Sequence, residues 1–150
     1  MEVTIKDQPQ LRIAGVRHIG PYHTIGQAFA SLGKILNGPP PPGSQMIAIY
    51  HDDPTATPST QLRSEAALTL PPDAANPDGL IEQRVPAGRF AYTVHKGSYE
   101  GLPGAWHALK SEWLPANGHR MAHPGYEIYL NNPMTAKPDD LLTEIYLRLE

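Results

Sequence analysis

The sequence predicts an α+β fold in which duplicated βαββ units form a largely antiparallel sheet. Two main helices are expected on one face, with a groove along a pseudo-twofold axis. The first observation behind this prediction is a repeated motif. The segments HIGPYHT (18–24) and HKGSYEG (95–101) both contain His-x-Gly-x-Tyr, 77 residues apart (95 − 18 = 77). At that offset 8 of the 34 positions in 3–36 and 80–113 are identical, whereas composition alone gives roughly two.

The second observation is that the match continues at a slightly larger offset. At 79 residues (126 − 47 = 79), IAIYHDDP (47–54) aligns with YEIYLNNP (126–133), and SEAALTL aligns with TEIYLRL. Order and spacing thus repeat over nearly the whole chain, which indicates an internal duplication. We therefore expect a single domain over residues 1–150, with copies at about 1–70 and 80–150 and a linker at 71–79. Residues matched by either offset are called counterparts below.

Each copy is expected to open with a strand pair. VTIKD (3–7) precedes LRIAGVRHI (11–19), and LIEQRV (80–85) precedes RFAYTVHK (89–96). β-Branched and aromatic residues are enriched in these segments, as is typical of strands. Pro9 and Pro86 mark the break between the two strands of each pair.

A sharp turn and a helix follow in each copy. The glycine of His-x-Gly-x-Tyr tolerates backbone angles that other residues resist, and the shared His18 and His95 are expected to stabilise the turn rather than to act in catalysis. Apolar residues at helical spacing then predict helices over 25–36 and 102–113. The run GPPPPG ends the first helix, and Pro115 with Gly118 ends the second.

Two further strands complete each copy, at 46–51 and 63–70 and again at 126–130 and 143–149. A strand layer with one helix is too thin to cover its own apolar face. The two copies are therefore expected to join edge to edge, with the groove between them as the place for a small ligand.

Composition excludes several classes of function. The chain has no cysteine, and its 12 Lys and Arg residues are scattered through a sequence of net charge −3, so no nucleic-acid surface is expected. Neither a signal peptide nor an apolar run long enough to span a membrane is visible, and we expect a cytoplasmic protein without membrane contact. His119 and His123 lack a third ligand, so no metal is expected, and no cofactor motif is present.

The motif HxGxY before a helix, the segment YEIYLNNP and the terminal TEIYLRL resemble the GyrI-like small-molecule-binding family. That family includes the effector-binding domains of multidrug-responsive regulators and the DNA gyrase inhibitory protein. The resemblance covers essentially the whole chain, and it implies a stand-alone domain with a pocket for drug-like molecules, often aromatic and cationic. It also implies that acids in the EIYL-type strands face the ligand. Some stand-alone relatives are linked to toxin resistance, and some hydrolyse cyclopropane-bearing toxins.

The two copies differ at two informative positions. Ala48 has Glu127 as its counterpart, and Ala67 has Tyr146, so the second copy has gained an acid and an aromatic ring. Tyr50 and Tyr129 are counterparts, as are Glu65 and Glu144. If strands 126–130 and 143–149 form a hairpin, two carboxylates and two phenols are expected to converge on one patch. Alternatively, the glutamates belong to the solvated face of the sheet.

Three functions fit such a patch. The first is capture of amphipathic aromatic or cationic compounds by a carboxylate walled with rings. The second is hydrolysis of an electrophilic toxin, with Glu127 activating water and Tyr129 orienting it. The third is protein binding of the gyrase-inhibitor type. The candidate ligand-binding residues are Glu127, Glu144, Tyr129, Tyr146, Tyr50, Tyr22, Tyr99, Trp106 and Phe29, the last two of which are expected first as core residues.

Overall fold

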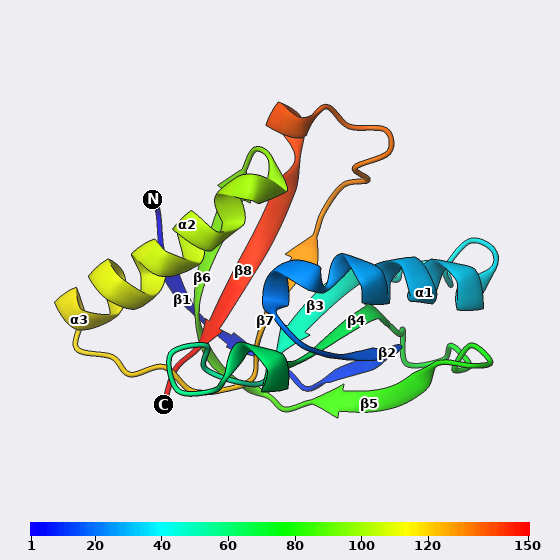
Figure 1. Cartoon of the computed structure of the whole chain (residues 1–150), viewed down its shortest axis with the longest axis horizontal. Coiled ribbons are helices and arrows are strands. Elements are labelled where there is room, and N and C mark those ends of the chain that lie inside the picture. Colours follow the sequence, from blue (N-terminus) through cyan, green and yellow to red (C-terminus); the bar gives the residue numbers. More distant parts are fainter.

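The computed structural model describes residues 1–150 as one eight-stranded sheet with helices on one of its faces (Figure 1). All neighbouring strands are antiparallel. The predicted α+β class is confirmed, and no helix is long and apolar enough to cross a membrane. The elements are β1 (Thr4–Gln8), β2 (Leu11–Ile19), α1 (Gly26–Leu36), β3 (Met46–Tyr50), β4 (Arg63–Thr69), β5 (Ile81–Val85), β6 (Gly88–Lys96), α2 (Leu102–Ala108), η4 (Leu109–Trp113), α3 (Leu114–Ala116), β7 (Gly125–Tyr129) and β8 (Leu142–Arg148), with short 3-10 turns between several of them.

The strand order places a pseudo-twofold axis between β3 and β7. The order is β1-β6-β8-β7-β3-β4-β2-β5, and it reads the same from either end when each strand is replaced by its counterpart. The two halves join through the β3–β7 pair, as the edge-to-edge prediction required. In that pair Ala48 lies directly opposite Glu127, its own counterpart.

The predicted strand pairs at the start of each copy are wrong. β1 pairs with β6 of the second half, and β5 pairs with β2 of the first half. The links are Pro9-Gln10 and Pro86-Ala87, whereas a two-residue hairpin favours Asn-Gly or a similar pair with positive φ. The chain therefore crosses to the other half instead of folding back. Because each two-residue link joins strands near opposite ends of the sheet, the sheet must curve strongly.

The turns before the helices are built as the repeated motif predicts. Gly20 and Gly97 have φ of 138° and 128°, a region that favours glycine. His18 Nε2 lies 2.8 Å from the hydroxyl of Thr24, and His95 Nε2 lies 2.9 Å from the carbonyl oxygen of Ser98. Both histidines thus hold the turn on which the following tyrosine is carried.

The second helix is longer than expected and changes its winding. Helical structure continues from Leu102 through Pro115 to Ala116, with a π-helical stretch, η4, in the middle. Pro115 lacks the N–H that an α-helix would pair with the carbonyl of Ser111, and the wider turn lies just before it.

Each face of the sheet has its own core. On the helix face, defined here as the face covered by α1 and α2, α1 packs on Ala14 and Leu68 while α2 packs on Ile145 and Leu147. The opposite face carries Ile13, Ile47, Ile49, Ala67, Val85, Phe90, Tyr126, Ile128 and Tyr146. This second cluster contains no helical residue and is built from strands of both halves of the sheet.

Candidate ligand-binding site at the pseudo-twofold axis

Glu127 lies in the middle of β7, on the helix face and beside the pseudo-twofold axis. Its partners across the sheet are Ala48 on β3 and Ile145 on β8, and Ile145 belongs to the cluster beneath α2. The residue is only 3% exposed. A carboxylate is costly to bury, so its hydrogen-bond partners decide how it is tolerated.

Three donors converge on the Glu127 carboxylate. Trp106 Nε1 donates to Oε1 at 2.6 Å, and the hydroxyls of Tyr129 and Tyr50 donate to Oε2 at 2.7 and 3.1 Å. Each of these bonds stabilises the ionised form, but burial outweighs them and raises the pKa of Glu127 above its usual 4.5. His95 is near enough to lower this pKa by its charge, but Glu127 forms no ion pair, so the result is a buried acid without a direct counter-ion.

Local geometry explains how these donors reach the carboxylate. Tyr50 and Tyr129 are counterparts near the ends of β3 and β7, and their side chains point to the same face as Glu127 because every second residue of a strand does so. Trp106 comes from α2 and lies across Gly125, where an added Cβ would be 3.3 Å from its ring. The absence of a side chain at Gly125 therefore allows the indole to lie against β7.

The surrounding rings repeat their contacts about the axis. Tyr22 packs against Tyr50 with ring centroids 4.8 Å apart, and their counterparts Tyr99 and Tyr129 are 5.4 Å apart. Across the axis Trp106 meets Tyr50 edge-on at 5.9 Å, and its counterpart Phe29 meets Tyr129 at 5.8 Å. The structure thus brings together seven of the nine candidate residues: Glu127, Tyr129, Tyr50, Tyr22, Tyr99, Trp106 and Phe29.

Glu144 and Tyr146 are not part of this group, and the expected convergence of two carboxylates is wrong. The predicted β7–β8 hairpin forms, but its register sets Glu127 opposite Ile145 and Glu144 opposite Ile128. Directly opposed residues point to the same face, so Glu144 and Tyr146 lie on the opposite face from Glu127. There the Tyr92 hydroxyl donates to Glu144 at 2.6 Å, and Tyr146 stacks on Tyr126.

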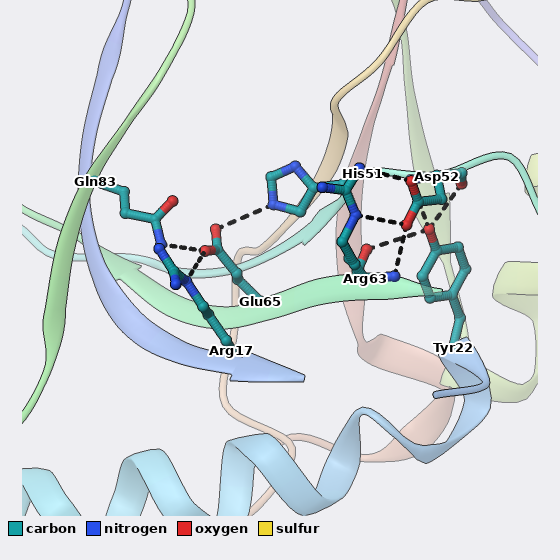
Figure 2. A network of polar contacts seen from close by, with 7 residues as sticks. All are labelled: Arg17, Tyr22, His51, Asp52, Arg63, Glu65 and Gln83. Atoms are coloured by element: carbon teal, nitrogen blue, oxygen red, sulfur yellow. Dashed lines mark hydrogen bonds and ion pairs between the residues drawn. The ribbon is translucent and has the colours of Figure 1, made fainter. Parts of the chain in front are cut away.

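The structure contains a second buried carboxylate, which the sequence did not predict as a site residue. Glu65, the counterpart of Glu144, is 4% exposed and accepts a hydrogen bond from the Gln83 amide. His51 Nε2 and Arg17 Nε lie 3.3 and 3.8 Å from its oxygens (Figure 2). Acids at matched positions of both copies indicate a structural role, and the mutual pairing of these side chains agrees with that reading.

The tyrosine at the edge of the site is fixed to the loop after β3. The Tyr22 hydroxyl donates to the Asp52 carbonyl at 2.7 Å and accepts from the Asp52 amide at 2.9 Å (Figure 2). The Asp52 carboxylate in turn accepts three bonds from Arg63 on β4, which hold its pKa below the usual range. Tyr22 and Tyr50 therefore form a wall anchored to the first half of the sheet.

The expected groove does not expose Glu127, which is only 3% exposed. Two shallow hollows on the surface lie elsewhere, one beside Arg12 between β2 and β5 and one between Trp113 and the N-terminal residues. The rings around Glu127 are half-buried rather than sealed. A ligand that reaches the carboxylate must therefore displace one or more of these rings.

An antiparallel sheet with two helices about a pseudo-twofold axis is the fold of a class of small-molecule-binding domains. The chain matches the GyrI-like small molecule binding domain over residues 1–150, and it belongs to that family. It is 34% identical over 134 residues to a DNA gyrase inhibitor of Yersinia enterocolitica, with 85% of each chain covered.

Solved structures share the fold. The crystal structure of the EcmrR C-terminal domain matches with a TM-score of 0.79 at 20% identity, covering 99% of this chain and 97% of the other. SAV2435 bound to tetraphenylphosphonium matches at 0.69 with 10% identity, covering 100% and 94%. A hydrolase from Listeria innocua matches at 0.67 with 12% identity, covering 99% and 92%. At such low identity these structures establish the fold alone.

Proposed function

We propose that this domain captures aromatic cations at the pseudo-twofold axis, with Glu127 as the counter-ion. The observation that carries the proposal is the buried Glu127 carboxylate, which accepts bonds from Trp106, Tyr50 and Tyr129 and forms no ion pair. Burying an uncompensated charge costs free energy, and a cationic ligand would remove that cost. Binding of a cation would therefore raise the free energy of unfolding of the protein.

The rings provide the second half of recognition. A delocalised cation is attracted to aromatic faces, and the effect grows as water is excluded. Tyr22, Tyr50, Tyr99, Trp106 and Phe29 come from both halves of the molecule. Because the rings close over the acid, they would open for the ligand and then pack against it. SAV2435, which has a similar fold, has a known structure bound to the aromatic cation tetraphenylphosphonium.

A fluorescence anisotropy titration with tetramethylrhodamine methyl ester, an aromatic cation, tests the proposal. Wild-type protein should bind the dye, and Glu127→Gln should weaken binding by about tenfold or more, since hydrogen-bonded charges contribute more than neutral pairs. A neutral aromatic compound should bind both proteins equally and weakly. Equal binding of the cation by both proteins, or no binding by wild type, would refute the proposal.

A second candidate is protein binding of the gyrase-inhibitor type, which the name of the Yersinia enterocolitica relative favours. A surface that inhibits gyrase would not need the buried Glu127. A supercoiling assay with wild type and Glu127→Gln separates the two functions. Equal inhibition by both proteins supports gyrase binding, and absence of inhibition by both rejects it.

A hydrolase is the third candidate, favoured by the raised pKa of Glu127. Such an acid is closer to the pKa that general acid–base chemistry requires near neutral pH. Here Glu127 would activate water, and Tyr129, which donates to it, would orient the group. Incubation with cyclopropane-bearing electrophiles, followed by mass spectrometry, distinguishes conversion from capture. Products that appear with wild type and not with Glu127→Gln identify a hydrolase.

A further inference from the structure

Lys110 is a half-buried ammonium without a hydrogen-bond or ion-pair partner at the edge of the Glu127 site. It lies in the π-helical stretch η4, four residues after Trp106, and its Nζ is 5.7 Å from the centroid of the Trp106 ring. The same indole donates to Glu127. No hydrogen bond or ion pair involves Lys110, and burial lowers its pKa. Its counterpart in the first half is Gly33, so the charge is specific to the second half.

His123 presents a second polar atom without a partner in the same region. Its Nε2 is buried and makes no hydrogen bond. The residue precedes β7 by two positions, close to Gly125, over which Trp106 lies. Burial lowers the pKa of His123, the negative charge of Asp53 raises it, and the positive charge of Lys110 lowers it again, with a net shift downward. A neutral ring that carries its proton on Nε2 donates a hydrogen bond from that atom.

The acids that face this region do not satisfy either group. The Asp53 carboxylate accepts two bonds from Thr55 and forms no ion pair with Lys110. Asp52 is occupied by Arg63. Buried polar groups normally have partners, and His123 Nε2 is a buried atom that has none. Lys110 is a charged donor close to it that forms no hydrogen bond, so one acceptor on a ligand would serve both groups.

We propose that Lys110 and His123 form an anion subsite beside Glu127, so that the domain selects aromatic zwitterions over simple aromatic cations. This inference rests on the proposed function and names its ligand class more narrowly. The cationic nitrogen of the ligand pairs with Glu127, and its aromatic body packs against Trp106. A carboxylate on the same molecule accepts hydrogen bonds from Lys110 Nζ and His123 Nε2. The negative charge of Asp53 repels the ligand's carboxylate and therefore limits the preference for zwitterions over cations.

A matched pair of dyes tests the subsite. Tetramethylrhodamine carries a pendant carboxylate and is a zwitterion, whereas its methyl ester is a cation of nearly the same shape. Lys110→Met should weaken binding of the zwitterion by about tenfold, since a charged donor is lost, and should leave the ester within about twofold. His123→Ala should weaken the zwitterion to a smaller extent. Asp53→Asn should strengthen it, because a repulsive charge is removed.

The outcomes separate this inference from the proposed function. If neither dye binds wild type, both proposals fail. If both dyes bind and Lys110→Met changes them equally, the anion subsite fails and the cation site stands. If Lys110 instead serves to hold the loop that carries Asp53, then Lys110→Met and Asp53→Asn should change zwitterion binding in the same direction. Opposite directions support the subsite, and equal directions refute it.

Discussion

Glu127 on β7 lies directly opposite Ala48 on β3, and each is the counterpart of the other in the two halves of the chain. The pseudo-twofold axis therefore passes between an acid and a methyl group. Both halves provide a tyrosine at the next position on the same face, Tyr50 and Tyr129, and both hydroxyls donate to the single acid. The backbone and the tyrosines are close to symmetric here, whereas the negative charge is present in the second half only.

The first prediction moves the acid across the axis. In Ala48→Glu/Glu127→Ala the new carboxylate keeps both tyrosine donors within reach, because opposed residues on one face have Cβ atoms about 5 Å apart. The carboxylate at position 48 loses the indole donor, because the ring that occupies the matching place in the first half is Phe29, the counterpart of Trp106. We expect Glu127→Ala to abolish cation binding and the double variant to restore part of it. Adding Phe29→Trp should increase the recovery.

The control for this series is Ala48→Glu alone. Two carboxylates facing each other in a buried site repel, and the cost of burying the second one is about 3 kcal/mol or more. Chemical denaturation should show this variant to be much less stable than the double variant. Equal stabilities would contradict the opposition of the two positions across the axis.

The second prediction concerns the donor from α2. Trp106→Phe keeps an aromatic ring near Gly125 but removes the N–H that donates to Glu127 Oε1. A hydrogen bond to a buried charged group contributes about 1.5–3 kcal/mol, so the free energy of unfolding should fall by that order at a pH above the pKa of Glu127. The loss should shrink below the pKa of Glu127, where the acid is neutral. Urea denaturation at two pH values measures both effects.

Residue patterns predicted the fold well because both copies carry the same signals. The turn glycines, the helices and the late strands all lie where spacing placed them. Strand pairing was harder to predict. Pro9-Gln10 disfavours a tight hairpin but does not say which strand β1 pairs with instead, and the packing of the whole sheet decides that.

The same limit applies to the site. Alternation correctly placed Glu127 with Tyr129, and Glu144 with Tyr146. It did not reveal the register between the two strands, and one step of register decides whether the two acids share a face. Comparison of the copies pointed to Glu127. The difference between Gly33 and its counterpart Lys110 is a signal of the same kind, because a charge is present in the second copy alone.

The third prediction follows from the raised pKa of Glu127. In the unfolded chain this acid titrates near its usual 4.5, and in the folded protein it titrates higher, so the folded state prefers the protonated form. The stability of wild type relative to Glu127→Gln should therefore rise as the pH falls through the folded pKa towards 4.5, and reach its plateau below that value. Thermal unfolding of both proteins from pH 8 to pH 4 measures the difference, and a pH-independent difference would contradict the shift.

The same shift predicts how cation binding depends on pH. Only the ionised acid attracts a cation, so the affinity of wild type for the rhodamine ester should fall as the pH drops through the raised pKa. The fall should begin at a higher pH than for an exposed glutamate. Glu127→Gln should show a flat profile over the same range.

The fourth prediction tests the two faces of the sheet. Glu144→Gln and Tyr146→Phe change groups on the face opposite Glu127, where Tyr92 and Tyr126 are their partners. Binding of the rhodamine ester should change by less than about twofold, since independent sites usually show little coupling. Glu127→Gln in the same titration provides the positive control. A loss of affinity in Glu144→Gln as large as that in Glu127→Gln would show that the ligand contacts the other face.

The last prediction tests whether the bare backbone at Gly125 positions Trp106. A Cβ at this residue would lie 3.0 Å from the carbonyl oxygen of Tyr146 and 3.3 Å from the indole ring. Gly125→Ala should therefore push Trp106 away from Glu127 and cost about 1–3 kcal/mol, as overpacking does. Gly33→Ala, on α1 with no atom within 4 Å of the added Cβ, is the matched control and should stabilise the protein by about 0.5–1 kcal/mol. Dye affinity should fall in the first variant and remain unchanged in the second. If Gly125→Ala binds the rhodamine ester as tightly as wild type, contact between the indole and Glu127 is not required for capture.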